Sequence, residues 1–119
     1  MSRRSLQRLD DIAEAAATIR AHLDRGGLDD GLVFDAIRVR LIEIGEAAKG
    51  IEPEVLALEP TIPWRDVAAM RDHLAHRYFD TAHAVVQATI DNDLPPLVAA
   101  VERLRELLIA AAPPPEPKQ

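Results

Sequence analysis

Residues 70–78, which read MRDHLAHRY, are the stretch around which the rest of this chain is organised. They hold two of the four histidines and the only tyrosine. On a helix, which advances about 100° per residue, Arg71 and Tyr78 share a face and Asp72 lies beside His76. An apolar stripe runs close to this polar side. That mixture is unusual for a helix that only fills a core, so the stretch is the candidate site.

Apolar residues recur at three- and four-residue steps on both sides of this stretch, as on amphipathic helices. They predict helices over about 6–23, 30–49, 64–78, 81–92 and 97–111, with one short helical turn at 54–58. Signals for β-strands are absent. We therefore expect an all-α fold, an up-down bundle of four to five helices with short loops, over residues 1–112. The proline-rich residues 113–119 are expected to be a disordered tail.

Helix boundaries and loop anchors can also be read from the sequence. Asp29 or Asp30 can cap the second predicted helix, and Gly50 is a good terminator for it. Trp64, after a connection punctuated by prolines, is expected to tie that connection to the bundle. An RNA-stacking role for Trp64 is the alternative.

The fourth predicted helix follows a break in the pattern after residue 78. Asp80 or Thr81 is expected to cap it, and Ala84, Val85, Ala88 and Ile90 are expected to face inward. Residues 93–96, which read DLPP, should stop this helix or bend it.

Gly45 lies inside the second predicted helix, where glycine costs about 1 kcal/mol relative to alanine. Such a glycine is kept when something approaches the helix backbone closely. Gly45 either packs tightly against the 70–78 helix or leaves room beside a site. Glu46, the next residue, could reach Arg71 or His76 as a supporting carboxylate, or it could be a solvated glutamate.

Composition excludes several classes of function. The formal net charge is −6 and the pI is near 5.1, which argues against broad phosphate-driven nucleic-acid binding but leaves a local site open. The chain has no cysteine, which excludes disulfides and thiol nucleophiles and fits a reducing cytoplasm. Serine occurs only at positions 2 and 5, and no glycine-rich phosphate loop is present. No apolar run is long enough for a membrane span, and no signal peptide is evident, so we expect no membrane association.

Histidine, arginine, carboxylates and tyrosine are the residues left to carry chemistry in the 70–78 stretch. RNA can be cut without a metal or cofactor, because its own 2′-hydroxyl is the nucleophile. His76 could move protons near neutral pH, and Arg71 could stabilise charge on the phosphate. One chain supplies only one such pair, whereas the reaction needs both an acid and a base. A two-fold homodimer would double it.

Less specific interpretations of the same residues stay open. His76 could make an ordinary hydrogen bond, and Arg71 could simply pair with Asp72, Asp66 or Glu46. The chain could be a non-catalytic helical dimerisation or adaptor module. A third hypothesis is a metal-dependent hydrolase, with a ligand set drawn from His73, His76, His83 and either Asp80 or Asp72.

Arg71, His76 and Tyr78 form an R-x4-H-x-Y pattern, and three further blocks accompany it in order: IGEAAK at 44–49, IPW at 62–64 and DLP at 93–95. Together they resemble the HepT-type toxins of the HEPN-domain ribonuclease superfamily, over about residues 5–110.

The resemblance implies a HEPN-like bundle that forms a homodimer and acts as a metal-independent endoribonuclease toxin. It also implies a nucleotidyltransferase antitoxin as partner, which neutralises the toxin by adenylylating Tyr78. Arg71 and His76 would be catalytic. Asp72, where the family often has asparagine, would orient one of them, and His73 would serve packing or contact phosphate.

Overall fold

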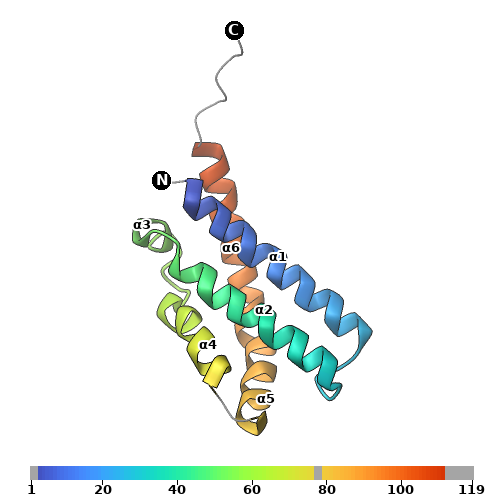
Figure 1. The fold of residues 1–119 in the computed structure, drawn as a ribbon. Coiled ribbons are helices and arrows are strands. Elements are labelled where there is room, and N and C mark those ends of the chain that lie inside the picture. The colour runs from blue at the N-terminus through green and yellow to red at the C-terminus, as the bar shows by residue number, and fades with distance from the viewer. Residues whose placement is uncertain (1–2, 77–78, 112–119) are drawn as a thin grey trace.

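The computed structural model describes the backbone of residues 3–76 and 79–111, with side chains other than those of residues 75, 76 and 79–82. This part of the chain is built from helices and contains no strand (Figure 1). In order they are α1 (Arg3–Arg25), α2 (Gly31–Lys49), α3 (Pro53–Leu56), α4 (Trp64–His76), α5 (Phe79–Ala88), the π-helical η1 (Thr89–Asp93) and α6 (Leu94–Ala111). The prediction of an all-α up-down bundle is confirmed. The predicted tail at 113–119 lies outside the described residues.

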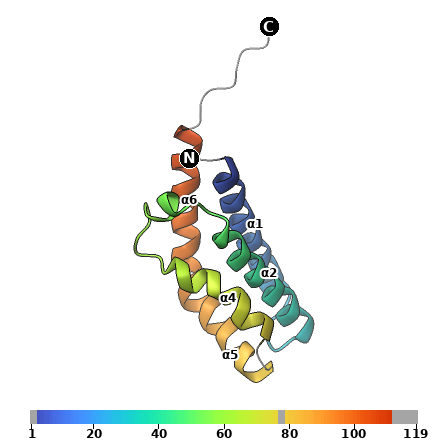
Figure 2. The same ribbon diagram turned by 60° about the vertical axis from the view of Figure 1, so that its left-hand side comes forward.

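Helices α1 and α2 form an antiparallel pair, and the other long helices pack against it (Figures 1 and 2). Helix α4 lies alongside α2 in both views, whereas α6 crosses α1 at an angle. The core between them is aliphatic, as the composition predicted. Its largest fully buried side chains include Leu9, Ile12, Ile19, Ile37, Leu41, Ile44, Val101 and Leu104. None of the described helices is long and apolar enough to cross a membrane.

The ends of α2 are set by the residues that the sequence singled out. Of the two candidate caps, Asp30 is the one used: its Oδ1 accepts hydrogen bonds from the backbone N–H groups of Leu32 at 2.9 Å and Val33 at 3.4 Å. Gly50 follows the last helical residue, and its N–H bonds back to the carbonyl of Ala47 at 3.0 Å. Both boundary predictions are confirmed.

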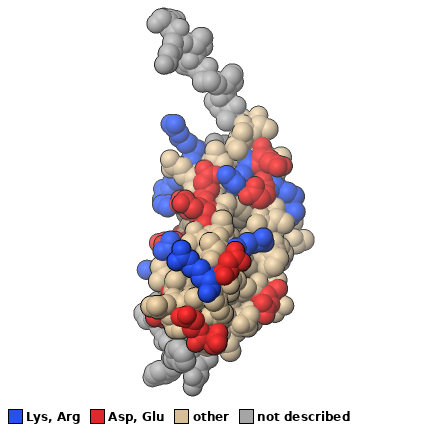
Figure 3. Space-filling model, turned by 90° about the vertical axis from the view of Figure 1, so that its right-hand side faces the viewer, with Lys and Arg blue, Asp and Glu red and all other residues tan. Residues whose placement is uncertain are grey.

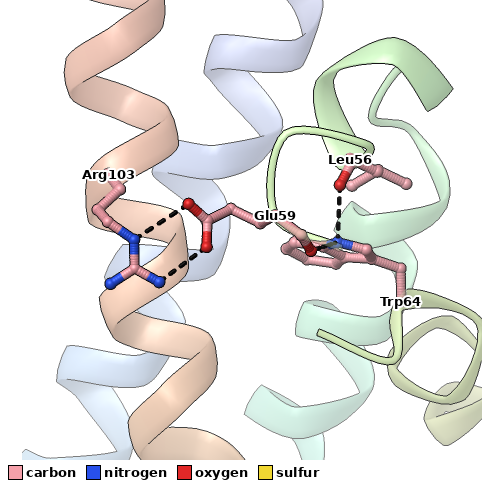
Figure 4. A network of polar contacts seen from close by, with 4 residues as sticks. All are labelled: Leu56, Glu59, Trp64 and Arg103. Atoms are coloured by element: carbon pink, nitrogen blue, oxygen red, sulfur yellow. Dashed lines mark hydrogen bonds and ion pairs between the residues drawn. The ribbon is translucent and has the colours of Figure 1, made fainter. Parts of the chain in front are cut away.

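Trp64 ties the connection between α3 and α4 to the bundle, as predicted (Figure 4). Its indole Nε1 donates to the carbonyls of Leu56 at 3.1 Å and Glu59 at 3.0 Å. The Glu59 carboxylate accepts two hydrogen bonds from Arg103 on α6, at 2.7 and 3.0 Å. One indole and one arginine therefore fix the connection in front of α4, and with it the position at which α4 begins.

The predictions for the fourth helix were partly wrong. Helix α5 begins at Phe79, so Asp80 and Thr81 lie within it and are not its caps. Of the residues expected to face inward, Val85 and Ile90 are half-buried and pack against the core, whereas Ala84 and Ala88 are exposed. Instead, Val86 is fully buried, and Thr89 is nearly so. The inward face is thus turned relative to the predicted one, and alanine, which is small and only weakly apolar, tolerates the exposed positions.

Residues 93–96 do not stop the helix. The π-helical turn η1 leads directly from α5 into α6, and Pro95 and Pro96 fall in the first turn of α6. Because the helical run is continuous here, the two prolines remove N–H donors to the preceding turn, and they are accommodated where the helix departs from regular α-helical geometry, at the π-helical turn η1.

Candidate active site at the contact of α2 and α4

Gly45 lies where the backbones of α2 and α4 approach each other closely. A Cβ atom placed on it would lie 3.0 Å from the backbone N of Arg71, 3.0 Å from the carbonyl O of Val67 and 3.2 Å from Cβ of Arg71. Of the two interpretations of Gly45, tight packing against the 70–78 helix is therefore confirmed. The absent side chain lets the backbone of α2 approach Arg71 itself, which brings the residues after Gly45 within reach of the Arg71 side chain.

Four charged side chains meet at this contact, and we call Glu46, Lys49, Arg71 and Asp72 the charge cluster. Glu46 Oε2 lies 2.7 Å from Nε of Arg71. Arg71 Nη1 donates a hydrogen bond to Asp72 Oδ1 at 3.2 Å. On the other side of Asp72, its Oδ2 lies 4.0 Å from Nζ of Lys49. Two helices thus supply alternating charges, and their sum is zero.

The charge cluster is open to solvent. The side chain of Arg71 is 46% exposed, and those of Glu46 and Asp72 are 60% and 61% exposed. Ion pairs with this exposure contribute about 0–1 kcal/mol to folding, so the cluster is a weak stabilising element. The pairing alternative for Arg71 is realised with Glu46 and Asp72. Since these pairs are exposed, the guanidinium also stays accessible to an anion from solution.

His76 is the last residue of α4, on the same helix as Arg71. His76 follows Arg71 by five positions, which on a helix is about 7.5 Å along the axis and about 140° around it. The side chain of His76 and the whole of Tyr78 lie outside the described residues.

The last turn of α4 is held by a contact that the sequence did not reveal. Arg38 of α2 donates from Nε to the carbonyl O of Leu74 at 2.8 Å, and the Leu74 side chain is fully buried. The final carbonyls of a helix have no intrahelical partner, so a side-chain donor there is stabilising. This bond fixes the helical turn that carries His76. Nothing in the local pattern around Arg38 marks it, because its partner is 36 positions away.

The other histidines that were singled out lie apart from the charge cluster. His73 borders a mainly apolar cavity of about 460 Å³ between α4 and the α5–η1–α6 segment, with Val67, Met70, Val85 and Leu97 also in its wall. His83 stacks on Phe34, with ring centroids 4.6 Å apart and an angle of 7° between the planes.

The metal-site alternative gains no support from the described side chains. Among them no group of three or more histidines and carboxylates is placed to hold a metal ion. His76 and Asp80, which that alternative could also use, have side chains outside the described part of the chain.

Charge on the surface is mixed. On the face drawn in Figure 3, acidic and basic side chains are interspersed, and neither sign forms a continuous patch. This face therefore carries no broad basic surface of the kind that binds nucleic acid through its phosphates.

Comparison with known proteins adds independent information. The model of the family described as "Ribonuclease HepT-like" matches residues 6–104. A Thermococcus cleftensis protein named "Probable ribonuclease HepT" is 39% identical over 111 residues, which is 89% of this chain and 100% of that protein. Two provisionally named RNases, from Caldanaerobacter subterraneus subsp. tengcongensis and Methanocaldococcus jannaschii, are each 36% identical over 56% of this chain, and over 60% and 55% of their own lengths. No solved structure matches the chain significantly.

Proposed function

Because the chain belongs to the HepT-like ribonuclease family, we propose that it is an endoribonuclease that cleaves RNA without a metal ion, with Arg71 and His76 as its catalytic residues. The observation that carries this proposal is the placement of Arg71. Its guanidinium is held at the contact of two helices, is half exposed, and belongs to the same helix as His76. An arginine fork in such a place suits an RNA phosphate, whose oxygens it can contact in pairs.

The chemistry follows from what RNA itself supplies. A general base removes the proton of the 2′-hydroxyl, whose oxygen attacks the adjacent phosphorus, and a general acid protonates the departing 5′-oxygen. The products are a 2′,3′-cyclic phosphate and a 5′-hydroxyl. Neutral imidazole serves as the base and imidazolium as the acid. Arg71 stabilises the negative charge that grows on the non-bridging oxygens in the transition state.

A homodimer would supply the second acid–base group that the reaction needs. One chain contributes one His76, whereas the reaction uses a base and an acid at the same phosphate. In a two-fold dimer that joins the ends of the two α4 helices, the second His76 takes the other role. The exposed charge cluster leaves room for a second chain and a phosphate on this side of α4.

Regulation by a partner is the remaining part of the proposal. The R-x4-H-x-Y pattern supports a role as the toxin of a cytoplasmic toxin–antitoxin pair, in which a nucleotidyltransferase antitoxin adenylylates Tyr78. Tyr78 follows Arg71 by seven positions, and the expectation that the two share a helix face comes from this spacing in the sequence alone. The phosphate of an attached AMP would bring negative charge and bulk to Arg71, and RNA phosphate would be excluded.

Cleavage of RNA by three single-alanine variants tests the proposed function. Arg71→Ala and His76→Ala should each lower kcat/KM by about 10²- to 10⁴-fold, the range for losing a charge-stabilising donor or an acid–base group. Arg65→Ala is the matched control, since Arg65 is an exposed arginine on the same helix that lies outside the charge cluster. Equal cleavage by the wild type and all three variants would remove the nuclease proposal and leave a non-catalytic adaptor module.

A further inference from the structure

The two carboxylates at Arg71 are held in different ways. Glu46 comes from α2, and its oxygen lies 2.7 Å from Nε. Asp72 is the immediate neighbour of Arg71 on α4, and its hydrogen bond from Nη1 is longer, at 3.2 Å. Adjacent helical residues do not face each other, so the second contact requires both side chains to turn toward one another. Asp72 is therefore the more easily displaced of the two.

Glu46 is anchored by the packing next to it. Gly45 lies against backbone atoms of both Val67 and Arg71, so α2 cannot move away from α4 without opening that contact. The backbone of Glu46 is consequently held at a set distance from the backbone of Arg71. The packing at Gly45 therefore keeps the Glu46 carboxylate within reach of the Arg71 guanidinium.

Asp72 has a second cation within reach. Lys49 Nζ lies 4.0 Å from Asp72 Oδ2, a distance at the outer limit of an ion pair. Lys49 follows Glu46 by three positions on α2, so both side chains project from the same side of that helix. A small rotation of the Asp72 carboxylate away from Arg71 would shorten its contact with Lys49, and the negative charge of Asp72 would stay compensated.

We propose that Glu46 and Lys49 are positioning residues for Arg71: Glu46 is the permanent partner of the guanidinium, whereas Asp72 is exchanged for an RNA phosphate and is then received by Lys49. The inference rests on the proposed function, in that its ligand is a phosphodiester. A phosphodiester carries one negative charge, as Asp72 does. The exchange therefore leaves the charge around Arg71 unchanged, and Asp72 is not left beside the phosphate without a cation.

The proposal predicts a different effect for the loss of each of these three charged side chains. Without Lys49, the released Asp72 repels the incoming phosphate, so ligand binding weakens. Without the charge of Asp72 there is nothing to displace, so binding strengthens and Lys49 no longer matters. Without the charge of Glu46 the guanidinium is no longer oriented, so the chemical step slows more than binding does.

The test is a double-mutant cycle on binding, with a 2′-O-methyl RNA oligonucleotide as a ligand that lacks the attacking hydroxyl. Lys49→Met keeps most of the side-chain length and removes the charge, and it should raise Kd by about 3- to 10-fold, as expected for an exposed charge contact. Asp72→Asn should lower Kd, and Lys49→Met added to Asp72→Asn should change it less than two-fold. Arg40→Met, which removes one charge from a pair with Glu43 on the same helix, controls for net charge and should leave Kd unchanged.

Kinetics with cleavable RNA complete the test. Glu46→Gln should lower kcat by about 10-fold or more while KM changes less than three-fold, a split that loss of binding alone does not produce. If Lys49→Met weakens binding equally in the wild-type and Asp72→Asn backgrounds, Lys49 contacts the phosphate directly and the exchange is refuted. If it weakens binding no more than Arg40→Met, Lys49 has no positioning role. Either result leaves the nuclease proposal standing, provided that Arg71→Ala still abolishes cleavage, whereas a wild type that neither binds nor cleaves RNA overturns both proposals.

Discussion

Replacing Gly45 with alanine perturbs the contact on which the candidate site is built. The new Cβ would lie 3.0 Å from two backbone atoms of α4, the N of Arg71 and the O of Val67. Backbone atoms cannot rotate away, so the two helices must separate by a few tenths of an ångström. Alanine gains about 1 kcal/mol of helix propensity over glycine. Overpacking a closely packed contact costs about 1–3 kcal/mol. We therefore expect a net loss of stability of about 1 kcal/mol, within a range of about 0–2.

Gly31→Ala is the matched control for this substitution. Gly31 is the first residue of α2, and a Cβ on it would meet no heavy atom within 4 Å. This substitution brings the gain in helix propensity, which is smaller at a helix end, and it has no steric cost. We expect Gly31→Ala to be neutral or slightly stabilising, so that the two glycine variants shift stability in opposite directions.

Urea denaturation followed by circular dichroism, at one fixed protein concentration, measures both variants. With a slope of about 1–3 kcal/mol per molar urea, a loss of 1 kcal/mol lowers the midpoint by about 0.3–1 M. Ribonuclease activity of Gly45→Ala should fall further than stability does, because displacement of a catalytic group by less than 1 Å can cost up to about 100-fold in rate. If Gly45→Ala raises the midpoint by as much as Gly31→Ala or more, the close approach of α2 and α4 is refuted.

Substitutions at three further positions test the surrounding frame by the same denaturation assay. Trp64→Phe removes the donor of two hydrogen bonds to loop carbonyls and should cost about 1–3 kcal/mol, whereas no loss would mean that the indole does not hold the loop. Asp30→Ala removes the cap of α2 and should cost about 1 kcal/mol, with Asp30→Asn costing clearly less; equal losses would argue against capping. Hydrogen bonds from Arg103 hold the pKa of the Glu59 carboxyl below its ordinary value of 4.5, so the stability that this pair adds is present above that value and is lost as the pH falls through the lowered pKa. The wild type should therefore exceed Glu59→Gln in stability at pH 6 by more than at pH 3, and a constant difference would contradict this.

Much of the frame was predictable because its signals are local. A glycine inside a long apolar-periodic helix marked Gly45 as a close contact, and an aspartate just before that helix marked its cap. The IGEAAK block also contained both α2 members of the charge cluster, Glu46 and Lys49. Only Glu46 was singled out, because a lysine near the end of a helix is also expected simply to stabilise the helix dipole.

What escaped prediction depends on contacts between distant parts of the chain. The inward face of α5 was assigned through Ala84, Val85 and Ala88, yet of these only Val85 packs against the core and Val86 is fully buried, because packing against the rest of the bundle decides which side is covered. The hydrogen bond from the Arg38 side chain to a backbone carbonyl in the last turn of α4 joins two different helices, so the periodicity of the sequence does not predict it. Whether Glu46 would pair with Arg71 or be solvated was likewise open, since the answer depends on how closely α2 and α4 approach each other.

The products of RNA cleavage in excess EDTA provide the most direct test of a metal-free reaction at Arg71 and His76. We expect the purified wild type to cut a defined RNA under these conditions, leaving 2′,3′-cyclic phosphate and 5′-hydroxyl ends by mass spectrometry, and to do so far faster than Arg71→Ala or His76→Ala. Ends with a 3′-hydroxyl and a 5′-phosphate, or cleavage that EDTA abolishes and a divalent ion restores, would contradict the proposal.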